Sequence, residues 1–166
     1  MANILVACIG NIFLGDDGFG VEVARRLAAR PLPSGVEAVD FGIRSYDLAY
    51  AMMEDWQLVI LVDAVPQGGP PGTLYVIEPD LAEFDSPEMP STLDAHTMNP
   101  VAVLQLVKLL GGRPRRVLVV GCEPASVETD DSGTMELSAP VRAAVGEAVR
   151  IIERLCLEFR DSARAA

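Results

Sequence analysis

The chain has 166 residues, half of them apolar, and its 24 acidic and 13 basic residues give a net charge of −11. This charge repels nucleic acid and anionic membrane surfaces, and no uninterrupted apolar run approaches the roughly 20 residues needed to cross a bilayer. We therefore expect no nucleic acid and no membrane as a partner; a cation or another protein is easier to accommodate.

The first residues and the cysteines favour a cytoplasmic protein. The chain runs from Met1 directly into an apolar stretch, without the basic region and cleavage site of a secretory signal. Cys8, Cys122 and Cys156 are scattered and odd in number, which is typical of reduced core thiols. The length predicts one domain over residues 1–160, followed by a frayed tail at 161–166. We expect a monomer.

Apolar runs alternate with helical patterns along the chain. The predicted strands span residues 4–9, 36–41, 58–62, 73–77 and 117–120, and the predicted helices span 21–28, 46–53, 100–110 and 139–159. This alternation predicts an α/β fold, a doubly wound and mostly parallel five-stranded sheet with helices on both faces, in three layers. Fewer than a dozen residues separate 58–62 from 73–77, too few for a helical crossover, so strand 73–77 is expected to be antiparallel or at an edge. Segment 78–99 is aperiodic, and we expect a long functional or mobile loop there.

Acidic side chains follow two of the predicted strands. Asp16 and Asp17 stand in a glycine-rich loop after the first strand, Asp63 ends the most apolar strand, and the only histidine, His96, precedes a helix. Because ligands bind beyond the carboxyl ends of parallel strands, all four can reach one sheet edge. Taken singly, Asp16 fits a helix cap, Asp63 a turn and His96 a solvated loop, whereas the charge of Asp17 beside Asp16 calls for a positive neighbour. Asp17, Asp63 and His96 together offer ligands suited to a divalent ion such as nickel or zinc.

Other catalytic signatures give poorer matches. The sequence has no GxSxG elbow, no HExxH, no P-loop and no GxGxxG turn. The tripeptide Asp131-Ser132-Gly133 matches that of aspartic proteases, but it lies in a polar run without apolar flanks and is interpreted as a loop. A receiver-like regulatory domain also places paired acids after its first strand, but here they come six to seven residues past that strand, and no lysine ends the last strand.

Several segments together resemble one known family, the hydrogenase maturation proteases, which trim the large subunit of nickel-iron hydrogenases. They are Gly-Asn-Ile-Phe-Leu-Gly-Asp-Asp-Gly-Phe-Gly-Val at 10–21, Val-Asp-Ala at 62–64, Gly-Thr at 72–73 and Asp-Ala-His at 94–96. The resemblance spans nearly the whole chain. It implies a doubly wound α/β hydrolase, an aspartyl-type endopeptidase that removes a C-terminal extension from the large-subunit precursor after nickel insertion.

The resemblance also implies roles for individual residues. The metal-contacting positions correspond to Asp17, Asp63 and His96, which we also expect to be catalytic, and the nickel comes with the precursor rather than as a tightly bound cofactor. Asp40 matches an acidic position of the family, but Phe-Gly-Ile-Arg-Ser at 41–45 replaces the more common Gly-Gly-Thr, which leaves the hydrogenase served open. A non-catalytic chaperone that checks nickel through the same site is the alternative. We expect Asp17, Asp63 and His96 to converge on one cleft, with Asp16 directed to the helix terminus or solvent.

Overall fold

The fold is built on a five-stranded sheet. The computed structural model describes residues 3–85, 99–125 and 135–165. The strands are β1 (Ile4–Ile9), β2 (Val36–Gly42), β3 (Leu58–Ala64), β4 (Leu74–Ile77) and β5 (Val117–Cys122), in the order β2-β1-β3-β5-β4. All neighbouring strands pair in parallel except β4, which pairs with β5 in antiparallel fashion. The prediction of a mostly parallel sheet with one reversed strand is confirmed.

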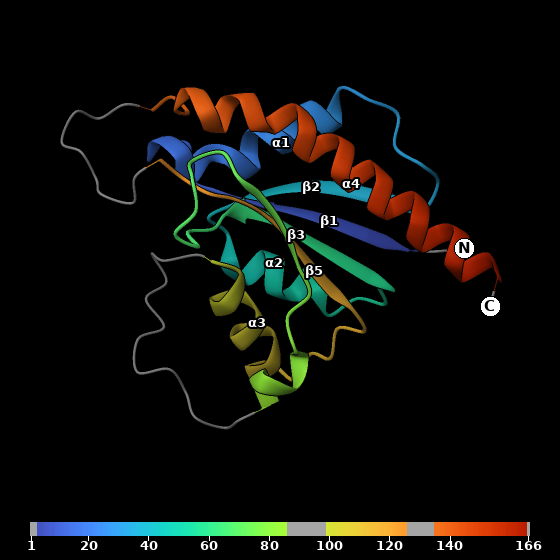
Figure 1. Cartoon of the computed structure of the whole chain (residues 1–166). Helices are drawn as coiled ribbons and strands as arrows, with labels where there is room; N and C mark the ends of the chain where they lie inside the picture. Colours follow the sequence, from blue (N-terminus) through green and yellow to red (C-terminus); the bar gives the residue numbers. More distant parts are fainter. Residues whose placement is uncertain (1–2, 86–98, 126–134, 166) are drawn as a thin grey trace.

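Helices cover both faces of this sheet (Figure 1). The helices are α1 (Phe19–Ala28), α2 (Ser45–Met52), α3 (Pro100–Leu109) and α4 (Ala139–Ala165). Side chains alternate between the faces along β1, so Ile4, Val6 and Cys8 pack in the core under α1 and α4, and the residues between them pack under α2 and α3. Because both faces are buried, β1 reads as a continuous apolar run.

The strand order creates a crevice at one end of the sheet. After β1, the chain passes to β2 on one side and then to β3 on the other side of β1. The chain that leaves β1 leads through α1 to β2, and the chain that leaves β3 leads to β4 at the opposite edge of the sheet. The connections diverge to opposite sides, so the carboxyl ends of β1 and β3 border a topological switch point. Ligands of doubly wound folds bind at such points.

The end of the last helix was predicted wrongly. Helix α4 was expected to end near Phe159, with residues 161–166 as a frayed tail, but it continues to Ala165 with exposed side chains from 161 on. Alanine and arginine, which favour helices, make up most of this last part, and neither glycine nor proline interrupts it. The aperiodic segment 78–99 contains a short 3-10 helix, η2 (Leu81–Asp85), and residues 86–98 lie outside the described part. The predicted start of α3 is confirmed, since the Asn99 side chain accepts a hydrogen bond from the Ala102 N–H at 2.9 Å.

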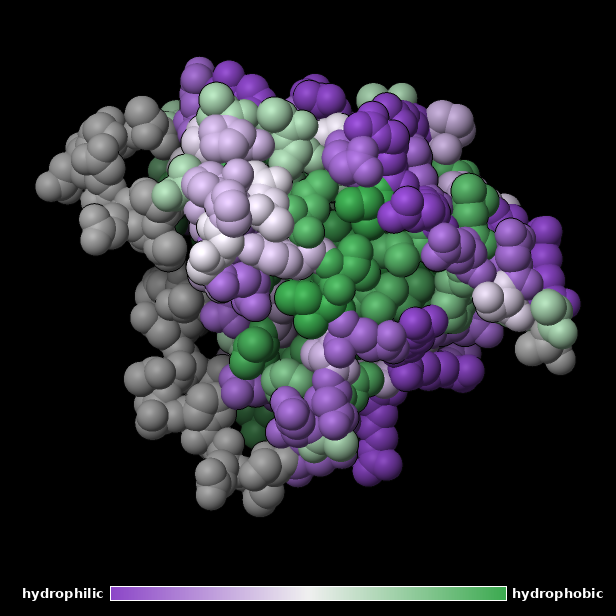
Figure 2. All heavy atoms as spheres, in the orientation of Figure 1, coloured by the Kyte–Doolittle hydropathy of each residue, from purple (hydrophilic) through white to green (hydrophobic). Residues whose placement is uncertain are grey.

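The surface carries some apolar side chains between the two helix layers. Figure 2 shows them gathered near the middle of the face that it presents. Edge strand β4, which pairs only with β5 among the described strands, exposes Val76. In the described ranges, no helix has both the length and the apolarity that a membrane crossing requires.

Candidate active site

Two glycines bring the loop after β1 onto the ends of the central strands. A Cβ atom on Gly20 would overlap the carbonyl oxygen of Ile9 and lie 2.7 Å from that of Val62, and a Cβ atom on Gly10 would overlap the carbonyl oxygen of Asp17. Only glycine fits at these positions, so the first turn of α1 packs directly on the ends of β1 and β3. This contact carries the 3-10 turn η1 (Gly15–Gly18) to the switch point.

Asp17 lies in η1 and is half-buried. The N–H of Asn11 donates to Asp17 Oδ2 at 3.1 Å and also to the Asp17 carbonyl oxygen at 3.1 Å, which closes the loop between β1 and η1. Burial raises the pKa of the Asp17 carboxyl group, and the hydrogen bond from Asn11 offsets only part of this rise.

Asp63 lies near the end of β3 and is only 1% exposed. Its Oδ1 accepts a hydrogen bond from the N–H of Ala64 at 2.8 Å. Burial, and then the negative charge of Asp17, raise the pKa of the Asp63 carboxyl group well above its usual range. The charge of Asp17 thus acts on Asp63 at the switch point. In such a pair one carboxyl group can stay protonated while the other is ionised, or a cation can neutralise both negative charges.

His96, the third predicted member of the site, lies outside the described residues, as does the tripeptide at 131–133. Within the described ranges no cluster of three or more histidine, cysteine, aspartate or glutamate side chains is arranged to hold a metal ion. The structure therefore describes two of the three predicted ligands, and the three-ligand metal site stays a prediction.

Asp16 takes a place that the sequence did not predict. It is 9% exposed, and neither η1 nor α1 has a side-chain cap, so Asp16 does not cap its own helix. Its Oδ1 accepts from the N–H of Ser138 at 2.7 Å, and its Oδ2 accepts from the Ser138 hydroxyl at 2.9 Å and from the N–H of Ala125 at 2.8 Å. Asp16 therefore fastens η1 to the residue that precedes α4 and to the segment that follows β5, rather than pointing to its own helix terminus or to solvent.

Asp40 lies at the same sheet edge, in β2, and is exposed. Its Oδ1 accepts from the N–H of Gly42 at 2.8 Å, and Gly42, with a φ of +54°, accepts a hydrogen bond from the N–H of Gly10 at 3.0 Å. Burial, and then the charge of Asp40, raise the pKa of the Cys8 thiol opposite it. Asp40 thus shapes the turn beside the site, and Cys8 stays a protonated core thiol.

Glu123 is a buried acid at this edge that sequence reasoning missed. It is 5% exposed and follows β5 directly. Its Oε2 accepts from the N–H of Gln67 at 2.7 Å and the hydroxyl of Tyr75 at 2.9 Å, and its Oε1 accepts from the N–H of Gly68 at 3.1 Å. Burial acts to raise the pKa of Glu123, but the hydrogen bonds together outweigh it and lower the pKa. Glu123 anchors the turn between β3 and β4.

Comparisons with known proteins give one consistent family. The model of a family described as hydrogenase maturation protease (HycI) matches residues 21–155. The hydrogenase expression/formation protein HupM of Azotobacter chroococcum is 36% identical over 155 residues, which cover 90% of this chain and 69% of HupM. The hydrogenase 2 maturation peptidase of a Thaumarchaeota archaeon is 31% identical, with a TM-score of 0.67 and coverage of 93% of this chain and 97% of that one. The hydrogenase maturating endopeptidase HybD of Escherichia coli is 27% identical, with a TM-score of 0.70 and coverage of 96% and 93%.

Proposed function

Because the chain belongs to the hydrogenase maturation proteases, we propose that it removes a C-terminal extension from the large-subunit precursor of a nickel-iron hydrogenase after nickel has been inserted. Members and structural neighbours of the family are described as maturation proteases and endopeptidases, so the chain is a peptidase. Beyond peptidase activity, the proposal specifies the substrate, the bond that is cut and the dependence of cleavage on nickel.

The observation that supports this proposal most directly is the position of Asp17 on a turn packed against the end of β3, where its charge acts on the buried Asp63. Asp63 is buried and its pKa is raised, first by burial and then by Asp17. Neither Arg nor Lys forms an ion pair with Asp17 or Asp63 among the described residues. A divalent cation carried by the substrate would supply the missing positive charge.

Nickel in the precursor offers a simple way to check the substrate. Without the cation, Asp63 holds its proton more tightly than an ordinary carboxyl group does, and it is then a poor ligand. A nickel ion presented by the precursor would lower the pKa of both acids; Asp63 would then give up its proton to solvent and could serve as a ligand together with Asp17 and His96. The ion can then position the scissile peptide, polarise its carbonyl or activate a water molecule.

The function is tested by processing of purified precursor. Precursor with and without nickel is incubated with the protein, and the mass of the large subunit is measured. We expect the mass to fall by that of the extension only when both nickel and the protein are present. Asp17→Asn should slow cleavage by about 10²-fold or more, whereas Asp161→Asn, the same substitution at an exposed position of α4, should not change it.

The same experiment separates a protease from a nickel-checking chaperone. A chaperone would bind nickel-loaded precursor through Asp17 and leave its mass unchanged. An uncut precursor after prolonged incubation with the wild-type protein, in the presence of Asp17-dependent binding, would therefore replace the peptidase proposal with the chaperone.

A further inference from the structure

Asp16 and Asp17 are neighbours in η1, but Asp16 has partners of its own. Its carboxylate accepts from the N–H and the hydroxyl group of Ser138 and from the N–H of Ala125, so both of its oxygens are engaged. Only 9% of its surface is exposed. A buried carboxylate that three donors satisfy is held in one place, and it is not free to act as a ligand or as a proton acceptor.

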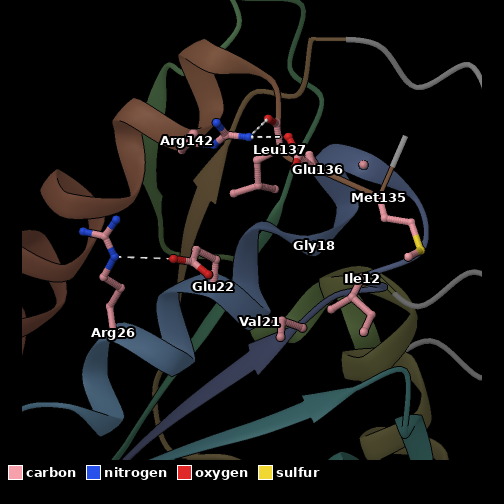
Figure 3. Close-up of a pocket in the computed structure, with 10 residues that line it drawn as sticks. Ile12, Gly18, Val21, Glu22, Arg26, Met135, Glu136, Leu137 and Arg142 are labelled. Atoms are coloured by element: carbon pink, nitrogen blue, oxygen red, sulfur yellow. Dashed lines mark hydrogen bonds and ion pairs between the residues drawn. The ribbon is translucent and has the colours of Figure 1, made fainter. Parts of the chain in front are cut away.

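Close packing does not fill the space on the outer side of η1. A pocket of about 310 Å³ lies between η1 and the segment that leads into α4, and Gly15, Gly18 and Leu137 are among the residues that line it (Figure 3). Even a Cβ atom added to Gly18 would stay 3.9 Å from the Leu137 side chain. The two segments therefore leave a hollow between them, and the hydrogen bonds from Ser138 to Asp16 are a direct link across their boundary.

Helix α4 gives this link a firm support. The carbonyl oxygen of Ser138 accepts from the N–H of Arg142 at 2.8 Å, and α4 packs with α1 in one core cluster. Just after the end of α1, Arg30 pairs with Glu153 of α4 at 3.1 Å, and both side chains are partly exposed. The segment from η1 to Arg30 is thus tied to α4 at both ends. The buried tie lies beside Asp17, and the exposed tie, of a kind that contributes little to stability, lies at the other end.

We infer that Asp16 is a positioning residue, which acts through Ser138 to hold Asp17 in place at the end of β3, where Asp63 lies. The inference rests on the proposed function, and it gives the first acid of the pair a role in the reaction other than that of a ligand. Asp16 and Asp17 share one turn of backbone, so a shift of Asp16 moves Asp17. A displacement of about 1 Å at a reacting group can cost roughly 10²-fold in rate.

Processing kinetics of three variants test the inference. Ser138→Ala removes the hydroxyl group that donates to Asp16 and leaves both N–H donors in place. With nickel-loaded precursor, its kcat should fall about tenfold and its KM should stay within about twofold, because the turn is misaligned while precursor binding is kept. Ser138→Thr keeps a hydroxyl group and should restore kcat. Glu153→Gln is the matched control, since it weakens the tie at the other end of α1, and it should leave kcat unchanged.

Hydrogen exchange of the Asn11 amide, followed by NMR, reports on the turn without any cleavage. This N–H donates to both the carboxylate and the carbonyl oxygen of Asp17 at 3.1 Å. In Ser138→Ala, exchange at Asn11 should become about tenfold faster or more, whereas the amides of β3 should keep their wild-type rates, because the change is local. Asp16→Asn weakens the same links while keeping one carbonyl oxygen, and it should show the same pattern even if Ser138→Ala fails to fold. Thermal unfolding checks the fold of each variant.

The two measurements separate failure of the inference from failure of the proposed function. If the wild-type protein cuts the precursor, a wild-type value of either kcat or Asn11 exchange in both Ser138→Ala and Asp16→Asn overturns the inference and leaves the function standing. An equal loss of kcat in Glu153→Gln, or no recovery in Ser138→Thr, also overturns it, because the effect would then lie in overall stability. If the wild-type protein never cuts the precursor while exchange at Asn11 rises in Ser138→Ala, the proposed function fails and Asp16 still positions Asp17.

Discussion

Asp63 and Glu123 are both buried acids at the same edge of the sheet, and their environments act on them in opposite directions. Glu123 receives hydrogen bonds from backbone N–H groups and from the Tyr75 hydroxyl, and its pKa is lowered. Among the described residues, Asp63 receives one hydrogen bond, from Ala64; it lies near the charge of Asp17, and its pKa is raised. Burial alone therefore does not identify a reactive carboxyl group. A buried carboxylate that accepts several hydrogen bonds is stabilised in its charged form and serves a structural role. One with few donors keeps a raised pKa and can exchange a proton or bind a cation.

The largest expected effect is on cleavage. Asp17→Asn and His96→Ala should each reduce the rate of processing by roughly 10²- to 10⁴-fold, the usual contribution of one acid, base or ligand group. Glu123→Gln should change the rate far less. The measurement is the mass of nickel-loaded precursor over time, with thermal unfolding of each variant. Normal processing by a stably folded His96→Ala protein would remove the metal-reading role of His96.

Substitution of Asp63 and of Glu123 should change the thermal stability of the protein in different directions. Asp63→Asn removes a buried group whose charge is disfavoured and keeps an acceptor for Ala64, so the Tm should stay the same or rise. Glu123→Gln weakens several hydrogen bonds to an ionised acceptor and should lower the Tm by several degrees. Tyr75→Phe removes one of those donors and should have a smaller effect of the same sign. A lower Tm in Asp63→Asn than in Glu123→Gln would contradict the comparison.

Stability should also depend on pH in two separate windows. The raised pKa of Asp63 means that the folded chain binds this proton more tightly, so the free energy of unfolding rises as the pH falls from the raised pKa toward the usual value of about 4. The lowered pKa of Glu123 acts in reverse, and its contribution is lost as the pH falls below about 4.3, its usual value. Urea unfolding of wild type and Asp63→Asn from pH 8 to 3.5 measures both windows. In Asp63→Asn, the free energy of unfolding should no longer rise as the pH falls toward about 4, whereas the loss below about 4.3 should remain.

Substitutions of Asp17 and Glu123 should also differ, by a smaller amount, in their effect on nickel affinity. In the proposed function, three ligands without a thiolate would leave the coordination of nickel incomplete, so the purified protein should bind nickel weakly until the precursor supplies cysteines. Calorimetric titration should show weak binding that Asp17→Asn reduces and Glu123→Gln leaves unchanged. Tight binding of nickel by the protein alone would contradict delivery of the ion by the substrate.

The smallest effect is expected at Asp131. Asp131→Asn should leave processing and Tm nearly unchanged, because the polar run around Asp131 predicts a loop. Loss of cleavage in this variant alone would favour an aspartic-type mechanism over the coupled pair of Asp17 and Asp63.

The sequence predicted the parts of the molecule that local patterns encode. Apolar runs identified the strands, and the short connection after Asp63 predicted the reversed strand β4. The ends of parallel strands also placed Asp17 and Asp63 at one edge. The roles of Asp16 and Glu123 could not be predicted, because their partners are N–H and hydroxyl groups between 48 and 122 residues away in the chain. No periodicity or spacing records such pairings. The place of His96 stays a prediction.

The hydrogen bonds of Asp16 to Ser138 give the protein an order of assembly. A ribosome adds roughly 5 to 20 residues per second, and a domain generally folds as a unit once its chain has emerged. The turn with Asp16 and Asp17 is made early, but its anchors at Ala125 and Ser138 come 109 and 122 residues later. The acidic turn therefore acquires its final support only when the last helix is about to be synthesised, and a nascent or truncated chain holds its reactive carboxyl groups without the frame that positions them.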